Sequence, residues 1–154
     1  MNFVVNLLIL LPAQIASHFS WAGPLLMRLI VGYTFMLTGW GKLTNLAQVT
    51  ENFVGWGIPL PKILTPFVSG VECFGGAMLI LGLFTRIPAA MLAVVMLVAI
   101  KSAKWGDVDS LETLLGFEEM TYLGAFMWLA ICGPGAASVD RLLVNAAGHP
   151  EKST

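Results

Sequence analysis

Residues 67–84 read FVSGVECFGGAMLILGLF, an apolar run with a single charged residue, Glu72, near its middle. An apolar stretch of about 18 residues or more is long enough to span a bilayer. If this stretch does so, Glu72 lies near the midplane, where a charged side chain costs roughly 2.5–3.5 kcal/mol on the insertion scale. Such a residue needs either a partner or a function.

The composition of the whole chain is typical of a membrane protein. Hydrophobic residues make up 57% of the 154 residues and charged residues 11%, whereas a soluble domain carries about 25% charged residues. The mean hydropathy is +0.82. The formal net charge of −1 provides no basic surface for phosphates, which excludes nucleic-acid binding. We expect one membrane domain, residues 1–154, in the lipid bilayer of a bacterial-type inner (plasma) membrane.

The hydrophobic pattern predicts an all-α fold, an integral-membrane four-helix bundle. Pro24 and Pro88 suit the first turns of two of the helices, and Gly133-Pro134-Gly135 ends the last one. An apolar stretch interrupted by Pro12 predicts a short N-terminal peripheral helix, and the helical periodicity after residue 136 predicts an amphipathic C-terminal tail. The expected ranges are 1–19 for the peripheral segment, 21–42, 62–84, 86–104 and 119–133 for the transmembrane helices, and 136–148 for the tail.

The connections between these helices differ in length. A tight turn at residues 83–86 makes the second and third helices antiparallel neighbours. Two long connections, 44–61 and 102–118, lie on one side of the membrane, and the termini lie on the other. Lysines and arginines are equally divided between the two sides, and the excess of acids on the long-connection side favours cytoplasmic termini. We interpret the acidic second connection as a solvated loop, or as a docking surface with Trp105 as an anchor.

Depth along the helices indicates Arg28 as the partner of Glu72. At about 1.5 Å per residue, Arg28 lies about 10 Å from the terminus side and Glu72 about 15 Å from either side. The two helices run antiparallel, so the side chains can form a charge-assisted, bidentate pair. Lys42 is expected near the opposite face, where it can extend to water.

This Arg28–Glu72 centre has a structural and a functional interpretation. As a structural element, it is a buried ion pair that fixes helix register. As a functional one, Glu72 accepts or relays a proton, or binds a polar head group such as that of a quinone. In this second interpretation Arg28 and Glu72 are the predicted catalytic residues.

Glycines are concentrated on the first two helices, where small residues allow close approach. Close packing is one interpretation of Gly75-Gly76. The alternative is that this pair leaves room for a ligand ring, with Tyr33, Phe35 and Phe74 as the walls of a quinone pocket.

Other redox centres are disfavoured by the sequence. His18 and His149 lie outside the expected spans, so no intramembrane histidine pair is present for a b-type haem. Cys73 and Cys132 stand on different helices without a C-x-x-C motif, which argues against a thiol relay or an iron–sulfur cluster. Methionines in the spans are interpreted as packing residues. We therefore expect no metal site and no tightly bound cofactor. Quinone is the cofactor that the sequence leaves open.

Six short motifs follow one another along the chain: residues 28–35 (RLIVGYTF), 39–42 (GWGK), Phe53 with 57–59 (GIP), 72–76 (ECFGG), 81–86 (LGLFTR) and 89–90 (AA). As an ordered set they resemble the DoxX family of small four-helix membrane proteins, and the resemblance runs from about residue 25 to 143. It implies an integral-membrane bundle, and some relatives act as membrane subunits of quinone-linked sulfur oxidation, such as thiosulfate:quinone oxidoreductase. Other relatives are associated with redox-stress complexes.

Two classes of function follow, and the sequence leaves open whether the chain is an enzyme. The first is a membrane subunit of a quinone-linked, sulfur-oxidising or other redox assembly, with redox subunits or further copies of the chain as partners. The second is a non-catalytic structural or assembly subunit of a larger membrane complex. A small-molecule carrier ranks third, because four short helices would have to oligomerise to form a path.

Overall fold

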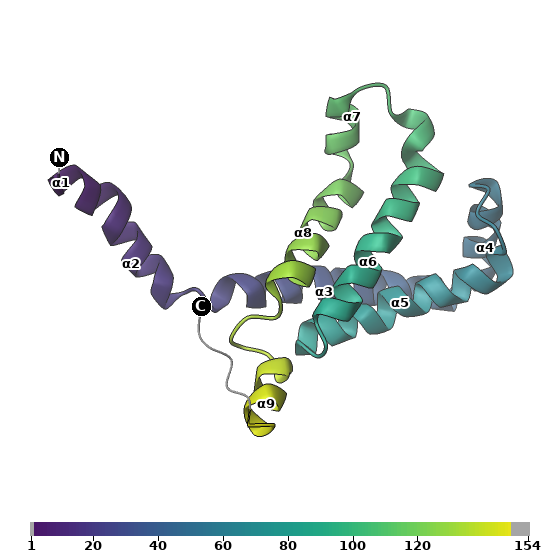
Figure 1. Ribbon diagram of the computed structural model, residues 1–154. Helices are drawn as coiled ribbons and strands as arrows, with labels where there is room; N and C mark the ends of the chain where they lie inside the picture. The colour runs from purple at the N-terminus through teal and green to yellow at the C-terminus, as the bar shows by residue number, and fades with distance from the viewer. Residues whose placement is uncertain (1, 149–154) are drawn as a thin grey trace.

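The computed structural model describes residues 2–148, with side chains from residue 4 onward, and every regular element in this part of the chain is helical. A nearly continuous helix opens the chain and a short helix closes it. Figure 1 shows the arrangement of the elements in space. Their bounds are α1 (Asn2–Val5), η1 (Asn6–Leu10), α2 (Leu11–His18), α3 (Ala22–Thr44), α4 (Leu46–Gly55), α5 (Pro61–Leu81), α6 (Arg86–Ala99), η2 (Ile100–Lys104), η3 (Trp105–Asp107), α7 (Leu111–Gly116), α8 (Glu118–Cys132) and α9 (Val139–Ala146).

The long helices form two pairs, α3 with α5 and α6 with α8, and the second pair diverges from the first (Figure 1). Glycines bring α3 and α5 together. A Cβ atom added to Gly32 would overlap the Gly76 carbonyl, and one added to Gly39 would overlap the backbone of Cys73. Backbones this close are typical of small residues at membrane helix crossings. Close packing, one of the two interpretations of Gly75-Gly76, is therefore what the structure shows at Gly76.

A hydrophobic core joins the two pairs near the point where they diverge. Phe35 of α3 contacts Phe126 of α8 edge-on, with ring centroids 4.8 Å apart, and Tyr122 at 5.1 Å. Edge-on aromatic pairs at this separation are favourable beyond the area that they bury. The remaining buried members of the core are Val31, Leu79, Ala89, Leu92, Ala93, Met96 and Leu129.

Within the described residues 2–148, three helical stretches are long and apolar enough to cross a membrane: Ala22–Thr44, Pro61–Leu81 and Arg86–Asp107. The fourth expected span corresponds to α8, whose 15 residues extend about 22 Å, less than the hydrocarbon thickness of about 30 Å. The prediction of an all-helical membrane protein is confirmed, and three of the four expected spans reach the necessary length.

The two long connections contain helices that the sequence analysis treated as loops. The first holds α4, which contacts α5, and the second holds the 3-10 turn η3 and the short helix α7. Ser110 begins α7 because its hydroxyl accepts a hydrogen bond from the Thr113 amide, the usual N-cap arrangement. The N-terminal helix of residues 2–18 extends away from the helix pairs (Figure 1), and its position at the membrane interface stays a prediction.

The C-terminal segment packs against the turn between α5 and α6. The Asp140 carboxylate accepts hydrogen bonds from the backbone amides of Phe84, at 2.6 Å, and Thr85, at 2.9 Å. The Asp140 amide in turn donates to the Gly82 carbonyl at 2.9 Å. These three bonds fix the start of α9, the expected amphipathic tail, to the start of α6.

Candidate functional site

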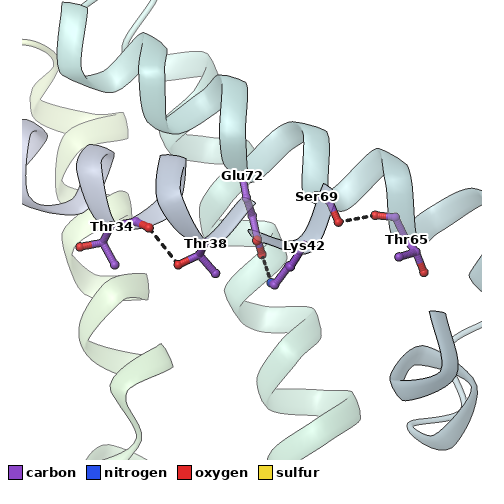
Figure 2. A network of polar contacts seen from close by, with 6 residues as sticks. All are labelled: Thr34, Thr38, Lys42, Thr65, Ser69 and Glu72. Carbon is purple, nitrogen blue, oxygen red and sulfur yellow. Dashed lines mark hydrogen bonds and ion pairs between the residues drawn. The ribbon is translucent and has the colours of Figure 1, made fainter. Parts of the chain in front are cut away.

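Glu72 forms an ion pair with Lys42, not with Arg28. The Lys42 Nζ atom donates a hydrogen bond to Glu72 Oε1 at 2.7 Å, and only 1% of the glutamate side chain is exposed. Figure 2 shows Lys42 of α3 and Glu72 of α5 pointing toward one another. The predicted Arg28–Glu72 pair is therefore wrong, and the partner of Glu72 is Lys42, whose side chain is 31% exposed.

The register of α3 against α5 explains this pairing. Gly39 lies against Cys73, so Lys42, one turn further along α3, is level with the first half of α5. From there its flexible stem reaches Glu72. The Arg28–Glu72 pair was predicted on the basis that both helices begin and end at the same membrane levels. In the observed register, Arg28 lies toward the far end of α5, away from Glu72.

Arg28 lies at that far end, in a site of its own. Its side chain is 1% exposed, and its Nη2 atom donates a hydrogen bond to the carbonyl of Ala137. The guanidinium lies against Gly82, where a Cβ atom would overlap it. Gly82 has φ +68°, a conformation that also favours glycine. Arg28 therefore ties the C-terminal segment to α3 and is absent from the surroundings of Glu72.

The Lys42–Glu72 pair lies in the wall of an apolar cleft of about 630 Å³. Three polar residues of α3, namely Thr34, Thr38 and Lys42, line the cleft and follow one another on one face of the helix (Figure 2). Their spacing of four residues predicts this common face. The sequence analysis missed this row, although the spacing alone would have revealed it. The aromatic residues in the lining are Phe35, Phe53, Trp56, Phe67 and Tyr122.

Threonine hydroxyls in this row donate to their own helix. Thr38 Oγ1 donates to the Thr34 carbonyl at 2.8 Å, and Thr34 Oγ1 donates to the Ile30 carbonyl at 2.9 Å. A hydroxyl whose proton is used in this way can still accept hydrogen bonds. On α5, Ser69 Oγ likewise donates to the Thr65 carbonyl at 2.7 Å (Figure 2).

Only one of the predicted quinone-pocket residues lines the cleft. Phe35 lines the cleft, whereas Tyr33 and Phe74 are 57% and 68% exposed and are absent from its lining. Gly76 packs against α3, and Gly75 packs against Pro88 and Leu92 of α6. The prediction of Tyr33, Phe74 and the two glycines as pocket walls is therefore wrong in its geometry.

The remaining candidate residues are dispersed. Cys73 is buried, Cys132 is exposed, and both are free thiols. Within residues 2–148, no three histidine, cysteine, aspartate or glutamate side chains gather in a way that could hold a metal ion. At the start of α8, just after the second long connection, Glu119 Oε1 lies 3.9 Å from Lys104 Nζ. Glu118 and Glu119 also line the cleft.

Known proteins resemble this chain in sequence over most of its length. A family model described as DoxX matches residues 23–105. The inner membrane protein YqjF of Escherichia coli (strain K12) is 32% identical over 121 residues, which cover 79% of this chain and 92% of the relative. The inner membrane protein YphA of the same organism is 29% identical over 132 residues, covering 80% and 94%.

A third relative carries a redox description. The protein named "Putative oxidoreductase CatD" of Bacillus subtilis (strain 168) is 33% identical over 82 residues, which cover 53% of this chain and 60% of the relative. No solved structure gives a significant match.

The three apolar helices and the buried ion pair define an integral membrane protein with a polar centre among its helices. The chain belongs to the DoxX family and is an inner-membrane protein.

Proposed function

We propose that the chain is a membrane subunit of a quinone-linked redox assembly and that its cleft binds the quinone head group beside Lys42 and Glu72. The observation that carries this proposal is an unused acceptor. Glu72 Oε2 is buried and has no hydrogen-bond partner, although the residue lines the cleft. A mostly apolar cavity with a few converging polar groups is the usual form of a small-molecule site.

The chemistry of the pair suits a quinone in both redox states. The Lys42 ammonium has three N–H groups, one of which is used on Glu72, so another can donate to a quinone carbonyl. A hydroquinone hydroxyl can donate to Glu72 Oε2. Aromatic lining residues such as Phe53 and Phe67 provide faces and edges for a flat ring. The oxidoreductase description of CatD supports a redox role of this kind.

In this role, a partner subunit exchanges electrons with the quinone that is bound in the cleft. In a sulfur-oxidising assembly, that partner would oxidise a sulfur compound such as thiosulfate and pass its electrons to the quinone. Further copies of this chain are alternative partners in the bilayer.

We further propose that α8 is the fourth span, which completes a four-helix membrane bundle with cytoplasmic termini. The close packing of α8 along α6 supports this placement. A fluorescent-protein fusion at the C-terminus should fluoresce, and an alkaline phosphatase fusion there should be inactive. The reverse pattern would contradict cytoplasmic termini.

A non-catalytic assembly subunit remains the second proposal, and the short ion pair supports it. A pair at 2.7 Å between two closely packed helices fixes their register whether or not a ligand binds.

Ligand binding separates the two proposals. The purified protein in lipid nanodiscs is titrated calorimetrically with decylubiquinone and with its reduced form, decylubiquinol. We expect both compounds to bind to the wild type. Glu72→Gln should lower the affinity for decylubiquinol by about tenfold, because a hydrogen bond to a charged acceptor is lost. Glu51→Gln, at an exposed position outside the cleft, should bind as the wild type does. If neither compound binds to the wild type, the quinone proposal is wrong; lower stability of Glu72→Gln with unchanged affinity would favour the assembly subunit.

A further inference from the structure

A second lysine–glutamate pair lines the same cleft from the other helix pair. Lys104 at the end of η2 and Glu119 in the first turn of α8 both belong to the lining. Their Nζ and Oε1 atoms lie 3.9 Å apart, and the side chains are 40% and 16% exposed. This pair is looser and more open than the Lys42–Glu72 pair.

Both glutamates keep one carboxylate oxygen free. Glu72 Oε2 and Glu119 Oε2 are each buried and without a hydrogen-bond partner. A buried polar atom without a partner costs free energy, and a hydrogen-bond donor placed in the cleft would remove that cost. Both oxygens belong to residues that line the cleft, one on α5 and one on α8.

The position of the two pairs follows from the contact between Phe35 and Tyr122. Beyond this contact, Lys42 lies about 10 Å from Phe35 along α3, and Glu119 lies about 4–5 Å from Tyr122 along α8. The helices α3 and α8 diverge in space (Figure 1). The two pairs thus line the cleft from the two helix pairs, which meet at the Phe35–Tyr122 contact.

The backbone at Lys104 is unusual. Ile100–Lys104 form a π-helix that directly continues α6, and π-helical turns inside helices occur frequently at functional sites. Three of its residues, Ser102, Ala103 and Lys104, line the cleft. This turn determines which residues at the end of α6 face the ligand space.

We propose that the Lys104–Glu119 pair is the second polar contact for the same ligand, so that the cleft binds a ring with oxygen atoms on two opposite edges. This inference rests on the proposed function and specifies its ligand as a para-quinone and its hydroquinone. Each pair offers one donor and one acceptor. The lysines donate to the two carbonyls of the quinone, and the glutamates accept from the two hydroxyls of the hydroquinone.

The test compares a ring that has two hydroxyl groups in para positions with a ring that has a single hydroxyl group. Wild-type protein and three variants, Glu72→Gln, Glu119→Gln and Glu112→Gln, are titrated in lipid nanodiscs with decylubiquinol and with 4-decylphenol. Glu112 is the matched control, because it is an exposed acidic residue near α8 that is outside the lining. Thermal unfolding of each variant identifies any loss of affinity that is due to misfolding.

We expect Glu119→Gln to lower the affinity for decylubiquinol by about tenfold, because one charge-assisted hydrogen bond is lost. The affinity for 4-decylphenol should be unchanged, because its single hydroxyl binds at the tighter Lys42–Glu72 pair. Glu72→Gln should lower the affinity for both compounds, and Glu112→Gln should change neither affinity. If Glu72→Gln weakens decylubiquinol while Glu119→Gln binds it as the wild type does, the second contact is wrong and the proposed function stands. If the wild type binds neither compound, the proposed function itself is wrong.

Discussion

Gly39 on α3 lies against the backbone of Cys73 on α5, so close that a Cβ atom at position 39 would overlap the Cys73 amide nitrogen. Together with the close approach of Gly32 to Gly76, this contact sets the register of the two helices. It also places Lys42 within reach of Glu72, because one helical turn separates Lys42 from Gly39.

Replacement of Gly39 should therefore destabilise the α3–α5 pair. In Gly39→Ala the added methyl group must push the helices apart, and overpacking of this kind costs about 1–3 kcal/mol. Thermal unfolding in detergent measures the change. Gly41→Ala is the control on the same helix, because nothing lies within 4 Å of a Cβ atom there, and it should unfold as the wild type does. Equal stability of the two variants would show that this contact does not hold the helices.

Removal of Lys42 should cost more than removal of the whole ion pair. Lys42→Met leaves the Glu72 carboxylate buried and without its counter-charge, so we expect the free energy of unfolding to fall by roughly 2–3 kcal/mol. This is less than for a fully buried pair, because Lys42 is 31% exposed. The double variant Lys42→Met/Glu72→Gln should recover much of that loss. Chemical unfolding measures the free energy of unfolding of the wild type, both single variants and the double variant, which together form a double-mutant cycle. Lys62→Met, at an exposed position of α5, is the control. An additive double variant would contradict direct coupling.

Asp140 should hold the C-terminal segment on the helix pairs. Asp140→Ala removes the acceptor of the Phe84 and Thr85 amides, and loss of such a cap costs about 1–2 kcal/mol. We expect faster cleavage by proteinase K between residues 133 and 138, detected by mass spectrometry. Asn145→Ala, exposed on the same helix, should be cleaved at the wild-type rate. Equal rates for both variants would mean that these bonds are not what retains the segment.

Aromatic residues of α5 should differ in their effect on ligand binding according to their position. Phe67 and Phe74 are both well exposed, but Phe67 lines the cleft and Phe74 does not. We expect Phe67→Leu to weaken decylubiquinone by about threefold to tenfold, the range of a lost aromatic contact, and Phe74→Leu and Tyr33→Leu to leave it unchanged. Calorimetric titration measures all three. An effect at Phe74 comparable to that at Phe67 would place the ligand outside the cleft.

The helices and the importance of Glu72 were predictable from the sequence. Apolar periodicity and terminal prolines and glycines are local signals, so they identify the long helices to within a few residues. A carboxylate within an apolar run is conspicuous because burial of a charge is costly. Close packing was one of two interpretations of Gly75-Gly76, since small residues allow membrane helices to approach closely, and the structure shows it at Gly76.

The partner of Glu72 and the shape of the cleft were not predictable in the same way. Both depend on how helices are placed relative to one another. The register at Gly39 and Cys73 decides that Lys42, and not Arg28, reaches the carboxylate. The helices α6 and α8 diverge from the first pair (Figure 1). Residues of both pairs line the cleft, and Tyr33 and Phe74 are not among them. A pattern along one helix carries no information about either relationship.

The hydrogen bond from Arg28 to Ala137 has a consequence for the order in which the protein matures. Its two residues are 109 positions apart in the chain, and the N-terminal part of a protein is synthesised and folds first. When α3 leaves the ribosome, the carbonyl that receives its guanidinium does not yet exist. The first long helix thus enters the membrane with a charge whose acceptor is made only after α5, α6 and α8, so Arg28 can reach its final contact only once residue 137 has been synthesised.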